Sequence, residues 1–99
     1  MAEHKVIVVA RFKSKAGMQE QLKSVLQRMA QEATKDSGCL RFELAQSVDD
    51  DTLFIFNECW ESKQDLGNHA KMPYIPLYRE EREPFLDGDP QVSTWRVVS

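Results

Sequence analysis

The chain has 99 residues, of which 41% are hydrophobic and 29% charged, a composition typical of one folded globular domain that we expect to span residues 1–99. A net charge of −3, with acidic and basic residues interspersed, argues against a nucleic acid or an anionic membrane as the partner. No apolar stretch approaches the roughly 20 residues of a membrane span, and the N-terminal residues lack a signal-peptide pattern, so we expect a cytoplasmic location.

The first third of the chain predicts a strand followed by a long helix. Residues 5–12 are β-branched and apolar at both alternating positions, which is typical of a strand covered on both faces. Apolar residues between Met18 and Ala33 recur at helical spacing and predict one amphipathic helix. Gly38 follows this helix and suits the left-handed conformation that ends many helices.

The rest of the chain predicts three strands and two shorter helices, delimited by turn residues, a cap and prolines. Apolar and polar residues alternate in the first of these strands, whereas the second is apolar at both parities through Phe56. The expected ranges are a strand at 39–48, an acidic turn at Asp49–Asp51, a strand at 52–60, a helix from the N-cap Ser62 to about residue 69 or 71, a helix from Pro76 to about Phe85, a loop at 87–90 and a strand at 91–98.

The element order β-α-β-β-α-β, with its second helix split, predicts an α+β, ferredoxin-like fold with helices on one face of an antiparallel sheet. Helices can cover only one face of this sheet, yet the strands at 5–12 and 52–60 are apolar on both. The second face therefore needs a partner, and the simplest partner is another copy of the chain packed sheet to sheet by a two-fold axis. We expect a homodimer.

One face of the strand at 52–60 carries candidate chemistry. Glu58 and Trp60 are two residues apart, so their side chains leave the same face, together with Phe54 and Phe56. A partly buried glutamate beside aromatic rings has a raised pKa and can act as a general base near neutral pH. Ordinary core packing explains the aromatic residues equally well, and strand parity does not say which side of the sheet they occupy.

The segment after Ser62 adds a histidine and two tyrosines. His69 has a pKa range suited to proton transfer and lies close to the helix break at Pro73. Tyr74 and Tyr78 are four residues apart and can line one helical face, either as ordinary packing or as phenolic hydrogen-bond donors in a pocket. A lone histidine is more often structural than catalytic, so both interpretations stay open.

Nucleotide and metal motifs are missing from the sequence. Neither GxGxxG nor GxxxxGK[ST] occurs, and no Cys or His spacing matches a zinc site. Cys39 and Cys59 lie in expected strands, where a cysteine usually acts as a small buried hydrophobe. We therefore expect no cofactor and no metal.

Several segments in fixed order resemble the antibiotic biosynthesis monooxygenase (ABM) superfamily. They are the glycine-led strand at 38–44, the acidic turn, the strand end Glu58-Cys59-Trp60-Glu61-Ser62, and His69 followed by Met72-Pro73-Tyr74. The resemblance implies a dimeric α/β barrel made of two ferredoxin-like protomers. It also implies a quinol-type monooxygenase that uses molecular oxygen without metal, flavin or other prosthetic group.

The same resemblance implies roles for individual residues. His69 would accept a proton from a phenolic hydroxyl, Glu58 would orient the imidazole or the substrate, and Trp60 would be a ring-stacking wall. The further candidates for substrate binding are Asn57, Tyr74 and Tyr78. Many members of the superfamily have Pro-His where this chain has Pro73-Tyr74, which is its clearest departure from the common pattern.

The expected function is the oxidation of a quinol or polyphenolic small molecule by molecular oxygen. One alternative is an isomerase of a small phosphorylated substrate, which would need a basic pocket that Arg79 and Arg82 leave possible. The other is a non-catalytic, dimeric protein that binds a small molecule. Haem-degrading relatives in the superfamily need an axial histidine on the last helix, and the expected helix from Pro76 to Phe85 contains none, so the resemblance makes haem the weaker alternative.

Overall fold

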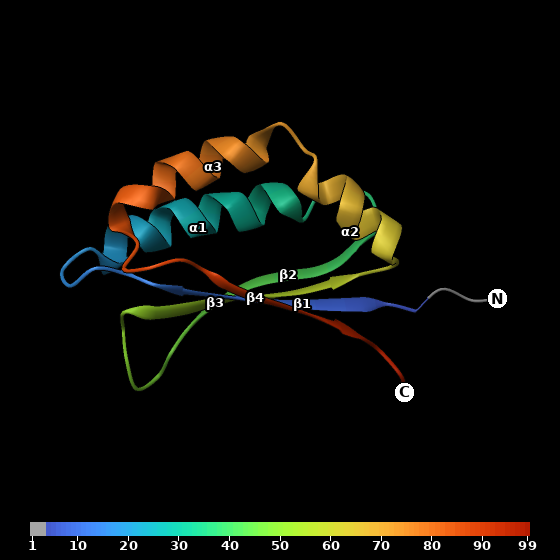
Figure 1. The fold of residues 1–99 in the computed structure, drawn as a ribbon, viewed down its shortest axis with the longest axis horizontal. Helices are drawn as coiled ribbons and strands as arrows, with labels where there is room; N and C mark the ends of the chain where they lie inside the picture. Colours follow the sequence, from blue (N-terminus) through green and yellow to red (C-terminus); the bar gives the residue numbers. More distant parts are fainter. Residues whose placement is uncertain (1–3) are drawn as a thin grey trace.

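The computed structural model describes residues 4–99 as a four-stranded antiparallel sheet with all helices on one face (Figure 1). Residues 1–3 lie outside the described residues. They include the start of the expected domain and of the segment that was inspected for a signal-peptide pattern. The strand order in the sheet is β2-β3-β1-β4, which confirms the α+β ferredoxin-like fold. The elements are β1 (Val6–Lys13), α1 (Gln19–Ala33), β2 (Cys39–Gln46), β3 (Leu53–Trp60), α2 (Lys63–Ala70), α3 (Tyr74–Arg82), the 3-10 turn η1 (Glu83–Phe85) and β4 (Gln91–Arg96).

The sheet is organised around β1 and β3, which lie next to each other at its centre. β1 pairs with both β3 and β4, so that Val8 lies opposite Glu58 on one side and Thr94 on the other. Every second residue of β1 and β3 is buried on the face toward the helices. The core on that face contains Val6, Val8, Ala10, Phe12, Phe54, Phe56 and Trp60.

The long helix α1 packs its apolar stripe on the sheet and runs beside α3 (Figure 1). It ends at Ala33, and Thr34 is its C-cap. The expectation that Gly38 ends the helix was therefore wrong, although Gly38 does have a left-handed φ of +80°. It lies in the turn into β2, and an added Cβ would come 2.2 Å from Cγ of Asp65. A side chain there would be strained and would push α2 away from this turn.

The start of the last helix also differs from the sequence-based expectation. α3 begins at Tyr74, and Pro76 is its third residue rather than its start. The first four N–H groups of a helix have no partner within the helix, so a proline at this position removes no hydrogen bond. The expected N-cap of the preceding helix α2 is confirmed, because Ser62 Oγ accepts a hydrogen bond from the Asp65 N–H at 3.1 Å. Most other boundaries agree within one or two residues.

The sheet face away from the helices is apolar along its centre, as the sequence predicts. The alternate residues of β1 and β3 that point there are partly exposed, and Trp95 of β4, opposite Ile7, is 59% exposed. The apolar side chains of this outer face include Ile7, Val9, Ala45, Leu53, Ile55, Cys59 and Trp95. Among residues 4–99, no helix has the length and hydrophobicity needed to cross a membrane.

Candidate functional site

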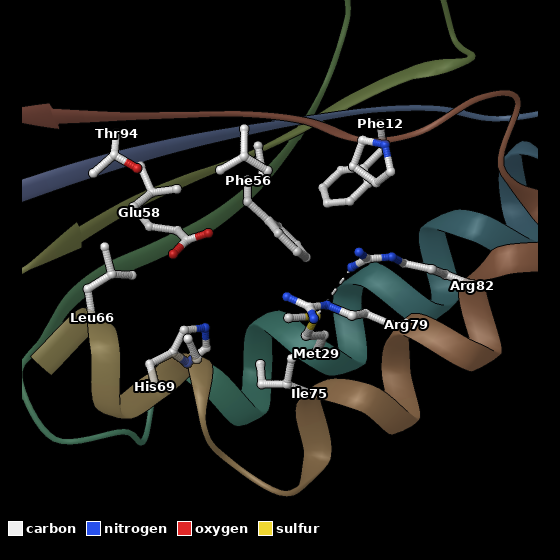
Figure 2. Close-up of a pocket in the computed structure, with 15 residues that line it drawn as sticks. Phe12, Met29, Phe56, Glu58, Leu66, His69, Ile75, Arg79, Arg82 and Thr94 are labelled. Carbon is white, nitrogen blue, oxygen red and sulfur yellow. Dashed lines mark hydrogen bonds between the residues drawn. The ribbon is translucent and has the colours of Figure 1, made fainter.

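A cavity of about 290 Å³ lies between the sheet and the helices (Figure 2). Its walls are mainly apolar. The charged or titratable side chains that line it are Glu58 from β3, His69 from α2, and Arg79 and Arg82 from α3. The sheet contributes Phe12 and Phe56, α1 contributes Met29, and α3 contributes Ile75. The parity question left open by the sequence is thereby answered: Glu58 faces the helices of its own chain.

Glu58 is a buried carboxyl group in the wall of this cavity. Its residue is 5% exposed, and Trp60 Nε1–H donates a hydrogen bond to its Oε1 at 2.9 Å. Burial raises the pKa of Glu58 to about 7, because a charged carboxylate loses its hydration there, while the hydrogen bond from Trp60 partly opposes the rise. Near neutral pH Glu58 therefore exists in both protonation states and can give or take a proton.

His69 is held by a carboxylate that sequence reasoning missed. Its Nδ1 lies 2.7 Å from Oδ2 of Asp36, in the turn between α1 and β2, and both side chains are less than 10% exposed. An ionised carboxylate can only accept, so Nδ1 carries the proton and Nε2 of the neutral ring is left as a hydrogen-bond and proton acceptor. The ring of His69 lies on Trp60, with 4.6 Å between ring centroids. Figure 2 shows His69 and Glu58 on the same side of the cavity.

Tyr74 contacts both members of this histidine–carboxylate pair. Its hydroxyl donates a hydrogen bond to Asp36 Oδ2 and lies 3.1 Å from His69 Nδ1. Burial raises the pKa of Tyr74, and the hydrogen bond to Asp36 raises it further, so the phenol stays neutral and remains a donor. Tyr78 donates to Glu32 Oε2 at 3.0 Å. The two tyrosines share a helical face, as expected, but this face is turned toward α1 and the turn after it, and neither residue lines the cavity.

Trp60 and Asn57 also lie away from the cavity wall. Trp60 is fully buried, where it positions Glu58 by a hydrogen bond and His69 by ring packing. The aromatic rings that do line the cavity are those of Phe12 and Phe56. Asn57 has the opposite strand parity, so it lies on the outer face of the sheet with Nδ2 3.4 Å from Glu43 Oε1.

Neither cysteine is engaged in a disulfide, and no metal-binding cluster is found in the part of the chain that the structure describes. Cys39 and Cys59 are half-buried free thiols. Within residues 4–99, no group of three or more His, Cys, Asp or Glu side chains is arranged to hold a metal ion. The titratable side chains that line the cavity are those of Glu58, His69, Arg79 and Arg82.

Three solved structures illustrate how widely this fold is shared. A provisionally named antibiotic biosynthesis monooxygenase from Nitrosomonas europaea is 17% identical with a TM-score of 0.90, over 99% of this chain and 94% of that one. A protein from Pseudomonas aeruginosa is 19% identical with a TM-score of 0.90, over 100% and 99%. A protein from Shewanella oneidensis is 24% identical with a TM-score of 0.89, over 96% and 92%. At such identities the likeness establishes the fold alone.

The family is established by the sequence itself. No curated protein matches the chain. The model of the antibiotic biosynthesis monooxygenase family, however, matches residues 5–81, which include β1, both hairpin strands, Asp36, Glu58 and His69. The chain belongs to the antibiotic biosynthesis monooxygenase family.

Proposed function

We propose that the protein is a cofactor-independent monooxygenase that oxidises a quinol or other polyphenolic small molecule with molecular oxygen. Membership of the family supports a monooxygenase-like role. The observation that carries the finer proposal is the pair of His69 and Asp36 beside Glu58, in the wall of an otherwise apolar cavity. A base, a second proton carrier and an apolar space for a ring are what the activation of a phenol requires.

The reaction begins with proton transfer from a phenolic hydroxyl to Nε2 of His69. Asp36 stabilises the imidazolium that forms, because its carboxylate accepts the hydrogen bond from Nδ1. The resulting phenolate is electron-rich at the carbon next to its oxygen-bearing carbon. The apolar walls from Phe12 and Phe56 hold the ring in place and keep water from competing for the anion.

The phenolate itself supplies the electrons that reduce oxygen. A bond forms between the ring carbon and one oxygen atom, and the peroxide that results takes a proton from Glu58 or from the imidazolium. The O–O bond then breaks as the same ring carbon loses its hydrogen, which leaves a ring carbonyl and releases water. A quinol and O₂ thus yield a hydroxyquinone and one water, so that no external reductant is consumed.

Oxygen uptake and isotope labelling test this proposal directly. Protein freed of metal and flavin is mixed with a reduced benzoquinol, and we expect uptake of one O₂ per quinol, one ¹⁸O from ¹⁸O₂ in the product and no hydrogen peroxide. Spontaneous oxidation of a quinol instead yields the unsubstituted quinone and peroxide. Uptake no faster than this background, with no ¹⁸O in the product, would refute the monooxygenase.

The isomerase alternative is favoured by one observation, the presence of Arg79 and Arg82 in the cavity wall. Arginine pairs well with phosphate. Turnover of a small phosphorylated substrate without oxygen uptake, lost on removal of either arginine, would support the isomerase in place of the monooxygenase. Tight binding of a phenol without turnover would support the alternative that the protein only binds a small molecule and is not an enzyme.

We further propose that the protein is a homodimer joined through the outer face of the sheet. The partly exposed apolar side chains there, including Ile7, Val9 and Ile55, would be covered by the same side chains of a second copy. Light scattering after gel filtration at micromolar concentration should give twice the monomer mass of 11.4 kDa.

A charge on this face should separate the two copies. We expect Ile55→Arg to give the monomer mass, because an arginine buried against its symmetry mate leaves two charges without partners. Leu77→Arg is the matched control, since Leu77 is 64% exposed on α3, away from the sheet, and this variant should remain a dimer. A monomeric wild type would refute the dimer.

A further inference from the structure

Two arginines of α3 reach into the cavity beside the proposed catalytic residues. Ile75, Arg79 and Arg82 are spaced by four and three residues, so they form one stripe along α3 that lines the cavity. Figure 2 shows both guanidinium groups reaching from α3 into the space between the helices and the sheet. Arg82 lies near Phe12, and Arg79 lies near Met29, between Arg82 and the side where Glu58 and His69 lie. The cavity therefore has proton-transfer groups at one side, with two cations extending toward them from the other.

No carboxylate of residues 4–99 forms an ion pair with either of these two cations. The ion pairs found among residues 4–99 involve Lys13, Arg28, Arg41 and His69, and none involves Arg79 or Arg82. Glu81, which lies between the two arginines in sequence, is on the outside of α3 and pairs with Arg28. The contacts of the Arg82 guanidinium are the ring of Phe12, at 4.9 Å from its centroid, and the sulfur of Met29, at 4.0 Å.

The surroundings of Arg82 are unfavourable for its positive charge. Arg82 is half-buried, and desolvation and the positive charge of Arg79 lower its pKa, while the nearby carboxylate of Glu83 partly opposes this. Arg79 is exposed, so the cost falls on the half-buried Arg82, and neither the ring of Phe12 nor the sulfur of Met29 beside it is an anion. An anionic group on a ligand would offset this cost and accept hydrogen bonds from both guanidinium groups.

We propose that the substrate is a hydroxylated aromatic carboxylate, bound with its hydroxyl group toward His69 and its carboxylate toward Arg79 and Arg82. The inference rests on the proposed function for the hydroxyl group, and on the two arginines for the carboxylate. The planar guanidinium fork matches a carboxylate in two parallel hydrogen bonds. The ring lies between, against Phe12 and Phe56.

The charges of Glu58, Arg79 and Arg82 also determine the orientation in which the substrate binds. With the ring reversed, its carboxylate would lie beside Glu58, which is itself ionised in part near neutral pH. Like charges there would repel, whereas the hydroxyl group would face two cations and lose contact with its base. Arg79 and Arg82 are thus specificity-determining residues that present the hydroxyl group, rather than the carboxylate, to His69.

Binding measured without oxygen tests the inference apart from any turnover. The probes are (2,5-dihydroxyphenyl)acetate, its one-carbon-longer homologue and the methyl ester of each, titrated into the whole protein by anaerobic calorimetry at pH 7. We expect at least one of the two acids to bind about tenfold or more tightly than its ester, the size expected of a charge-assisted hydrogen bond. In Arg79→Gln and Arg82→Gln this ratio should fall close to one.

Matched variants separate the local effect from net charge and from misfolding. Arg82→Lys keeps the charge but loses the fork, so it should retain only part of the preference for the acid. Lys15→Gln removes one positive charge from an exposed position in the loop before α1 and should keep the wild-type ratio. The circular dichroism melting curve of each variant shows whether it is folded, and the comparison of acid and ester in the wild type needs no variant.

The outcomes for substrate class and for function can be told apart. Equal binding of acid and ester by the wild type, in both homologues, would overturn the inference even if neutral quinols are oxidised. Tighter binding of 4-hydroxyphenyl phosphate than of either acid would also overturn it, in favour of a phosphorylated substrate. A clear preference for the acid that both Gln variants abolish supports the carboxylate site, and it does so even if no oxygen is then consumed.

Discussion

Replacing His69 by alanine is expected to lower kcat for oxygen uptake by about 10²–10⁴-fold, the usual contribution of a positioned general base. His69 is the side chain in the cavity wall whose free ring nitrogen can accept the phenolic proton, because Asp36 fixes the proton on Nδ1. The measurement is the initial rate of oxygen uptake with a saturating quinol, corrected for the rate without protein. Equal kcat values for the wild type and the variant would remove His69 from the mechanism.

Asp36→Asn is the companion variant for the positioning role of the carboxylate. The amide can no longer stabilise an imidazolium, so we expect a lower kcat, with KM changed less than kcat. Tyr74→Phe removes one donor to Asp36 and should have a smaller effect in the same direction. An unchanged kcat in folded Asp36→Asn would mean that the carboxylate only supports the fold.

We compare the free energy of unfolding of Glu58→Gln with that of the wild type. The variant's value minus the wild-type value is expected to be about 3 kcal/mol larger at alkaline pH than near pH 4.5. The folded protein raises the pKa of Glu58 from 4.5 to about 7, so it binds this proton more tightly than the unfolded chain does. The stabilisation is complete below pH 4.5 and is lost as the pH rises through 7. Glutamine stays neutral throughout and can still accept the hydrogen bond from Trp60.

The measurement is the free energy of unfolding by urea for both proteins between pH 4.5 and 8, at one fixed protein concentration. Glu80→Gln, at an exposed position of α3, is the control and should change the free energy by no more than about 0.5 kcal/mol across this range. A difference between wild type and Glu58→Gln that does not vary with pH would mean that Glu58 is as well hydrated in the folded protein as in the unfolded chain.

The fold could be predicted from the sequence because its signals are local and repeated. The apolar stripe of α1 and the alternation in β2 each require only the spacing of a few neighbouring residues. The errors are at single residues where two conformations are both permitted. Pro76 fits the first turn of a helix at more than one position, and Gly38 allows a left-handed turn whether or not a helix ends there.

The candidate site was only partly predictable, because its residues meet through space. Glu58 and His69 stand out by residue type, but Asp36 lies 33 residues before His69, and no spacing rule links a carboxylate in one turn with an imidazole in another helix. The tyrosines were correctly expected to share a helical face. Which face of α3 contacts α1 and which lines the cavity depends on how the two helices pack.

By itself the sequence determined the α+β fold, the family, and the placement of Glu58 on one face of a strand with its aromatic neighbours, because these follow from periodicity and from motifs in fixed order. Only the tertiary structure decided that this face is turned toward the helices, that Asp36 holds His69, and that Arg79 and Arg82 line the same cavity. The reason is physical: strand parity and helical spacing place residues relative to their own element, whereas burial, pKa and charge balance depend on what the neighbouring elements bring alongside.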